Sequence, residues 1–113
     1  MHSIHNALFD QIPAVRYVAV LDKDELSLHQ RHGVSDASSN ESDRYEELFV
    51  NPAILLLASN RGKVDCGGME YAVIRYGNFF QFIRATETGH ISIAIEPNAN
   101  LDQTIDQVLA VLP

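Results

Sequence analysis

The sequence has one cysteine, few basic residues and no long apolar run. A single cysteine, Cys66, among 113 residues cannot form an internal disulfide, which suits a reducing compartment. Eight lysines and arginines stand against fifteen acids, and the net charge of −7 argues against binding to nucleic acid or to anionic membranes. No apolar run approaches the ~18 residues of a membrane span, and the first residues lack the basic and apolar regions of a signal peptide. We therefore expect a cytoplasmic protein.

The length and the hydrophobic content predict one folded domain. A chain of 113 residues and 12.6 kDa, with 46% hydrophobic residues, can bury one core without disulfides or metals. We therefore expect a single domain over residues 1–113.

The hydrophobic periodicity predicts eight elements in the order helix, strand, strand, helix, strand, strand, strand, helix. The expected helices cover residues 3–12, 43–60 and 101–112, and the expected strands cover residues 16–22, 26–32, 69–76, 79–85 and 90–96. The polar segment 33–42 is expected to be a loop. Asn51 is expected to be a cap before Pro52 at a first helical position, so we expect a kink or a restart of the helix there. This order indicates an α+β fold of three layers (α/β/α), with helices on the faces of a five-stranded, mostly antiparallel sheet.

The sequence offers little of the chemistry that an enzyme needs. Gly62–Lys63 lacks the other residues of a phosphate-binding loop. Cys66 is a nucleophile only if a histidine lies beside it, and His90 is the residue whose approach within hydrogen-bonding reach would support that. A small residue beside a Gly67–Gly68 turn is the simpler interpretation of Cys66. We therefore expect no catalytic residue, no cofactor and no enzyme activity.

Histidine pairs give no clear metal site. His2 and His5 share a helix face, but near a chain end an exposed polar pair is the simpler interpretation. His29 and His32 are three residues apart, which places them on opposite faces of a strand. We therefore expect no bound metal.

The sequence has more apolar surface than one small domain can bury. Residues 53–58 are apolar on every side of the expected helix, whereas a helix on the sheet of a monomer needs a polar outer face. Each large side chain left in water forfeits roughly 1.5–3 kcal/mol. The strand at residues 69–76 follows this helix and is expected at a sheet edge with few blocking charges. Both features predict that a second copy of the chain covers them, and the alternative for the helix is a local loop that folds over it.

Three local motifs stand out beside the element order: Asn51-Pro52-Ala53-Ile54-Leu55, Asp65-Cys66-Gly67-Gly68 and Tyr76-Gly77-Asn78-Phe79-Phe80. Together with the element order they resemble the roadblock family of dynein light chains and, within it, the bacterial stand-alone domains. The resemblance covers nearly the whole chain and implies the roadblock-like, profilin-like fold.

The resemblance also implies a function without catalysis. Roadblock domains form homodimers through the central helix and the third strand, and they act as regulatory or scaffolding platforms for small Ras-like GTPases. On this chain the resemblance implies a dimer interface on the helix and the strand, formed by Ala53, Ile54, Leu57, Ala58, Tyr71, Val73 and Arg75.

A second class of function stays open at this point. A mixed sheet flanked by helices can hold a small molecule, and Tyr71, Phe80 and Phe82 are candidates to line an apolar pocket of a sensor domain. Core packing is the simpler interpretation of the phenylalanines.

Overall fold

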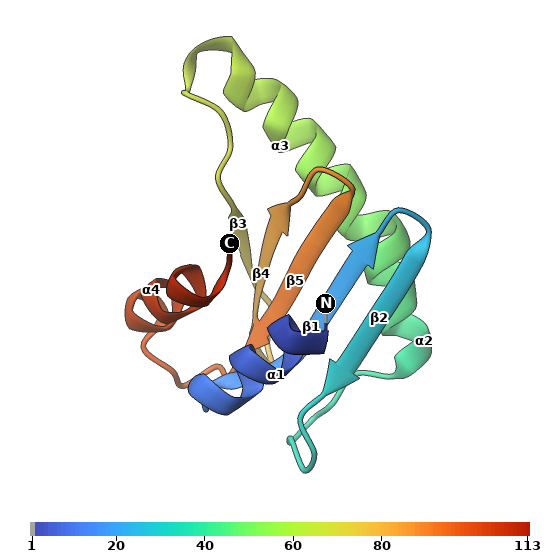
Figure 1. Ribbon diagram of the computed structural model, residues 1–113, viewed down its shortest axis with the longest axis vertical. Helices are drawn as coiled ribbons and strands as arrows, with labels where there is room; N and C mark the ends of the chain where they lie inside the picture. Colours follow the sequence, from blue (N-terminus) through green and yellow to red (C-terminus); the bar gives the residue numbers. More distant parts are fainter. Residues whose placement is uncertain (1) are drawn as a thin grey trace.

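A computed structural model describes residues 2–113 and has the predicted order of elements (Figure 1). In chain order the elements are α1 His2–Gln11, β1 Val15–Asp22, β2 Glu25–Gln30, α2 Asn40–Tyr45, η1 Glu46–Val50, α3 Asn51–Asp65, β3 Ala72–Arg75, β4 Phe80–Ala85, β5 Gly89–Ile95 and α4 Leu101–Val111. The five strands form one antiparallel sheet in the order β2-β1-β5-β4-β3. The predicted α+β fold is therefore confirmed, with β2 and β3 at the two edges.

The apolar core lies between the sheet and the helices α1 and α4. Val18 and Val20 of β1 point to this face with the isoleucines of β5, and Leu8 and Val108 pack on them from the two helices. The period-2 pattern of β5 and the 3.6-residue period of α4 predicted this layer correctly. Asn100 caps α4 as its sequence indicates, because its side chain accepts from the Gln103 N–H at 3.0 Å.

The opposite face of the sheet carries one continuous helix over residues 40–65, which we call the long helix. It begins in the segment that was predicted to be a loop, and Ser39 caps its first turn. The predicted cap at Asn51 is wrong, because Asn51 has helical dihedrals of φ −63° and ψ −42°. The α-helix does resume at Asn51, with Pro52 in its first turn, but the chain stays helical through this point. The residues before Pro52 instead form π-helical turns, in which the Asn51 N–H donates to the carbonyl of Glu46. The wider turn accommodates a proline ring that clashes with an ordinary helix interior.

The end of the long helix also differs from the prediction. The helix does not end at residue 60 but continues to Asp65, and Gly67, at φ +79°, follows its end. The Gly62 carbonyl accepts from the N–H groups of Cys66 and Gly68, so the connection to β3 folds back against the last turn. The strand β3 is consequently shorter than residues 69–76, and Tyr71 precedes it.

Candidate functional site

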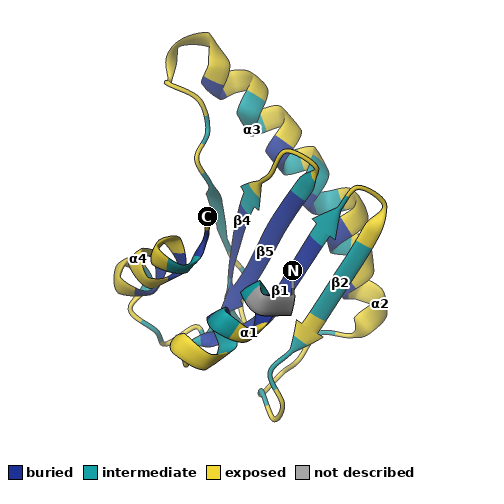
Figure 2. Ribbon diagram, in the orientation of Figure 1, coloured by how far each residue is buried: buried dark blue, intermediate teal, exposed yellow. Residues whose placement is uncertain are grey.

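Most of the large exposed apolar residues of the described chain belong to the long helix. Figure 2 shows exposed positions along this helix. The exposed fraction is 62% for Phe49, 61% for Leu56, 69% for Leu57 and 76% for Val64. Tyr45 and Phe49 contact each other, with their ring centroids 5.2 Å apart. The structure therefore places the predicted surplus of apolar surface on the outside of this helix.

The long helix has two flanks that face different parts of the sheet. Glu46 accepts a 2.6 Å hydrogen bond from the Tyr76 hydroxyl, directly after β3, so the flank that carries Glu46, Ile54 and Ala58 faces the β3 side. Pro52 and Leu56 lie on the other flank, which faces the ends of β1 and β4 and the turn before β5. We call these the β3-side flank and the turn-side flank.

The predicted dimer residues of the helix are accessible in the single chain. Ala53 and Leu57 are exposed at its outer surface, and Ile54 and Ala58 are half-buried on the β3-side flank. Within residues 53–58, the sheet buries Leu55, whose exposed fraction is 6%.

The predicted dimer residues near β3 have their side chains in two different environments. Tyr71 stacks on Phe82 with ring centroids 5.1 Å apart, and Val73 packs on the same core between the sheet and α4. Arg75 is exposed, and its guanidinium lies 4.8 Å from the centre of the Phe80 ring. The outer edge of β3 has no neighbouring strand in the described sheet. The backbone N–H and C=O groups at this edge can therefore pair with a strand of another chain.

The inner surface of the long helix is held on the sheet by a buried polar cluster. Glu47 is fully buried and accepts from the Tyr17 hydroxyl at 2.7 Å and from the Asn51 amide at 2.9 Å. His90 Nε2 lies 2.8 Å from the same carboxylate, and both residues are almost inaccessible to water. Asn51 also donates to Ser92 Oγ at 3.3 Å, and Gln81 donates to that hydroxyl as well. Hydrogen bonds on all sides compensate for burying a carboxylate.

Sequence reasoning did not identify this cluster. One signal was present: Asp43, Glu47 and Asn51 recur every four residues in phase with Leu55, and all four are buried. Such spacing places polar side chains on the inner stripe of a helix, where an apolar stripe is the usual pattern.

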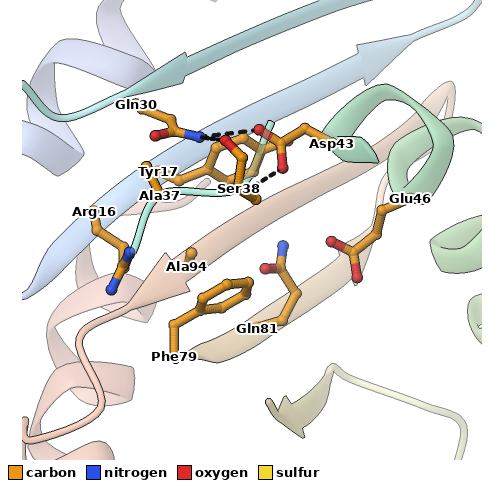
Figure 3. Close-up of a pocket in the computed structure, with 10 residues that line it drawn as sticks. All are labelled: Arg16, Tyr17, Gln30, Ala37, Ser38, Asp43, Glu46, Phe79, Gln81 and Ala94. Carbon is orange, nitrogen blue, oxygen red and sulfur yellow. Dashed lines mark hydrogen bonds between the residues drawn. The ribbon is translucent and has the colours of Figure 1, made fainter. Parts of the chain in front are cut away.

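Two more acids of the long helix contact the sheet end and the preceding loop, around a small pocket (Figure 3). Asp43 is buried and accepts from Gln30 Nε2 at 3.1 Å and from the Ser38 hydroxyl. Burial raises the pKa of the Glu46 carboxyl, and the Tyr76 hydrogen bond opposes part of that rise. Burial, with Glu46 as the second cause, raises the pKa of Tyr76 to about 12.

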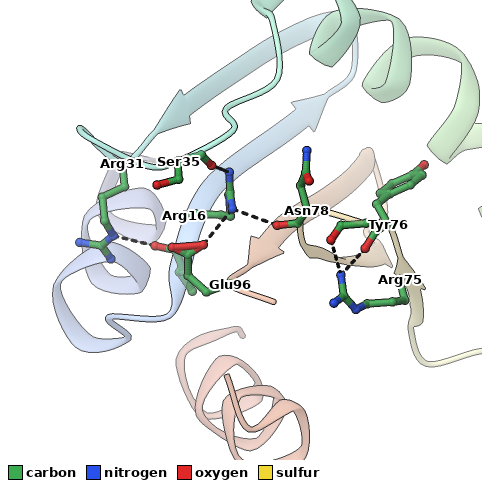
Figure 4. A network of polar contacts seen from close by, with 9 residues as sticks. Arg16, Arg31, Ser35, Arg75, Tyr76, Asn78 and Glu96 are labelled. Atoms are coloured by element: carbon green, nitrogen blue, oxygen red, sulfur yellow. Dashed lines mark hydrogen bonds and ion pairs between the residues drawn. The ribbon is translucent and has the colours of Figure 1, made fainter. Parts of the chain in front are cut away.

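Arg16 fixes the loop that precedes the long helix (Figure 4). Its buried guanidinium donates to the Glu96 carboxylate at 2.8 Å, to the Asn78 carbonyl at 3.0 Å and to the Ser35 carbonyl. These contacts join the polar loop to the β3–β4 turn and to the end of β5. The loop is therefore anchored to the sheet at the end where the long helix starts.

Within the described residues, the candidate nucleophile and the candidate metal ligands are not assembled into a site. Cys66 is exposed at the end of α3, with Asp65 as the partner of its Sγ, whereas His90 is buried against Glu47. His5 Nε2 lies 3.0 Å from Ser27 Oγ, and the side chain of His2 lies outside the described part of the chain. His29 is exposed and contacts the His5 ring. Among the described residues, no three histidines, cysteines or acids group as metal ligands.

The rings proposed for a small-molecule pocket pack against one another or against a neighbour. Phe82 is fully buried and stacked by Tyr71, and Arg75 lies over Phe80. These contacts occupy the ring faces that a sensor ligand would need. Within residues 2–113, no helix has the length and apolar content needed to cross a membrane.

Comparison with solved structures identifies the fold. A roadblock/LC7 domain from Streptomyces avermitilis superposes with a TM-score of 0.71 at 12% sequence identity, over 98% of this chain and 90% of that one. The gliding protein MglB from Thermus thermophilus gives a TM-score of 0.66 at 13% identity, over 98% and 86% of the two chains. An MglB with a tetrameric arrangement gives 0.70 at 11% identity, over 97% and 82%. No family model and no curated protein sequence matches the chain.

Proposed function

We propose that this chain, which has the roadblock fold, is a member of the roadblock family that works as a cytoplasmic, non-catalytic homodimer. The observation that carries the proposal is the exposed apolar surface of the long helix beside the free edge of β3. Leaving Leu57 and its neighbours in water forfeits roughly 1.5–3 kcal/mol for each side chain. A second copy is the economical way to bury them, because two-fold symmetry uses the same surface twice.

The free edge of β3 supports a particular geometry for this dimer. The strand pairs with β4 alone in the described sheet and contains no proline or lysine that would block a further strand. Antiparallel pairing of two β3 edges joins the sheets and brings together the β3-side flanks of the two long helices. Ile54, Leu57 and Ala58 then lie near the two-fold axis, with Ala53 beside them.

The partner in this proposal is a small Ras-like GTPase that binds on the paired helices. The roadblock fold and the aromatic pair Tyr45 and Phe49, which remain accessible on the outer surface, support a protein partner. Ring pairs of this kind supply large contact areas at the centres of protein interfaces. Binding of a fluorescent-labelled Ras-like GTPase from the same organism, in its GTP-analogue and GDP forms, tests this step.

The dimer is tested by charge insertion with a matched control. Leu57→Asp places a carboxylate in the proposed interface, where an unpaired buried charge is costly, so sedimentation should report a monomer at low micromolar concentration. Ala110→Asp adds the same charge at an exposed position of α4 and should leave the mass of the wild-type assembly unchanged. An unchanged assembly for Leu57→Asp would show that this surface is not the interface.

A further inference from the structure

The turn-side flank of the long helix carries a second apolar stripe, away from the β3 side. Leu48, Pro52 and Leu56 recur every four residues along it, and the exposed fraction is 38% for Leu48 and 61% for Leu56. Arg44 precedes the stripe by four residues, and Lys63 follows it seven residues after Leu56. The flank is thus an apolar stripe with one cation at each end.

A groove lies beside the second half of this stripe, from Pro52 to Lys63. It lies between the long helix and the strand ends, has a volume of about 300 Å³, and is lined by Leu56 and Lys63 from the helix and by Leu21 and Ala85 from β1 and β4. The groove is lined mainly by apolar side chains, and the long helix forms one straight side of it. A helix packs into such a groove through its own ridge of side chains.

In the part of the chain that the structure describes, the two cations at the ends of the stripe have no acidic partner. The other arginines all hydrogen-bond within the fold: Arg16, Arg31, Arg61, Arg75 and Arg84. Among residues 4–113, the basic side chains that make no hydrogen bond or ion pair are Arg44, Lys63 and Lys23. The chain has fifteen acidic residues and a net charge of −7, yet among the described residues none of these acids pairs with Arg44 or Lys63.

We propose that the turn-side flank binds an amphipathic helix of a partner protein, with an acidic residue at each end of its apolar face. Arg44 and Lys63 are nineteen residues apart, which in a helix is about 28 Å, so the partner helix has about five turns between its acids. The proposal rests on the proposed function in one respect: the second copy occupies the β3-side flank, which leaves the turn-side flank open.

The test uses two synthetic peptides of about 24 residues, long enough to span both cations. Both have leucines at helical i, i+3, i+4 and i+7 spacing; one has glutamates in its first and last turns and the other has lysines. Fluorescence anisotropy against the full chain should show the glutamate peptide binding about tenfold more tightly, from two exposed charge pairs. Equal affinities, or no binding of either peptide, would overturn the proposal.

Charge reversal on the protein sharpens the test. The double variant Arg44→Glu/Lys63→Glu should invert the preference, so that the lysine peptide binds more tightly. The control Arg61→Glu/Arg84→Glu makes the same change in net charge at two residues that do not line the groove, and it should retain the wild-type preference. An equal shift in both variants would attribute the preference to net charge and overturn the assigned site.

The two proposals fail in different ways. Leu56→Ser should weaken binding of the glutamate peptide severalfold while sedimentation still reports the wild-type mass. A wild-type chain that sediments as a monomer but keeps the peptide preference would contradict the proposed dimer and support the proposed helix-binding site. A wild-type chain that sediments as a dimer but shows no peptide preference would contradict the proposed helix-binding site and support the proposed dimer.

Discussion

The Tyr17 hydroxyl on β1 donates a 2.7 Å hydrogen bond to the carboxylate of Glu47 on the long helix, and both residues are buried. The same carboxylate contacts His90 and Asn51, so one acid joins β1, β5 and the next turn of its own helix. This face of the sheet is therefore held by directional polar contacts, whereas the opposite face is held by aliphatic packing. Directional contacts fix the rotation of the helix and hence which side chains it presents outward.

Removal of Glu47 should destabilise the fold more than removal of the hydroxyl that contacts it. Glu47→Ala leaves the Tyr17 hydroxyl and His90 Nε2 without their acceptor and the Asn51 amide with Ser92 alone, and it should lower the free energy of unfolding by about 3–5 kcal/mol. Tyr17→Phe removes one donor and should lower it by about 1–3 kcal/mol. Urea denaturation measures both, and exposed Glu41→Ala is the control, expected within about 0.5 kcal/mol of wild type. Equal effects of Glu47→Ala and Glu41→Ala would contradict the role given to this cluster.

Alkaline pH should weaken the fold through two tyrosines. Burial raises the pKa of Tyr17 well above its ordinary value, with Glu47 as the next cause, and raises that of Tyr76 from 10.0 to about 12. The unfolded chain therefore loses these protons first. The stabilisation from Tyr76 is present in full below pH 10.0 and is lost as pH rises through about 12, and that from Tyr17 declines over the same rise and beyond it.

The tyrosine effect can be separated by substitution. Tyr76→Phe should reduce the fall in the urea midpoint above pH 10.0, compared with wild type, because phenylalanine has no proton to lose. Tyr45→Phe, at an exposed position, is the matched control and should keep the wild-type slope. A Tyr76→Phe profile that overlies the wild-type profile would argue against the Glu46 contact.

A close backbone approach makes Gly89 sensitive to substitution. A Cβ atom there would lie 1.9 Å from the carbonyl oxygen of Leu21, so β1 and β5 would have to separate locally. Gly89→Ala should therefore lower the free energy of unfolding by about 1–3 kcal/mol or more. Gly77→Ala is the control, because a Cβ there has no atom within 4 Å, and it should be close to neutral. Thermal melting of the two variants side by side measures the difference.

The sequence predicts the aliphatic side of this fold better than its polar side. The alternation of β5 and the apolar stripe of α4 are local patterns, so they placed these elements and the core between them. The side chain of Asn51 contacts Glu47 and Ser92, and Ser92 is distant in sequence. The preference for asparagine before proline at a helix start is local, and it assigned Asn51 to a helix cap instead. The excess of apolar residues in the long helix is evident from its composition. The flank on which each side chain lies could be assigned only once the position of the helix on the sheet was known.

The candidate site was predicted in the same partial way. The helix residues Ala53 and Leu57 were expected to be accessible, and the structure leaves them exposed. Tyr71 and Val73 were expected beside them, but their side chains pack on the core of the other face. The assignment of these residues to a dimer interface stays a prediction.

The mass of the wild-type chain in solution tests the central claim most directly. Sedimentation equilibrium over a range of micromolar concentrations should give twice the chain mass of 12.6 kDa, because a second copy covers the apolar surface of the long helix. A mass of 12.6 kDa at every concentration would contradict that claim.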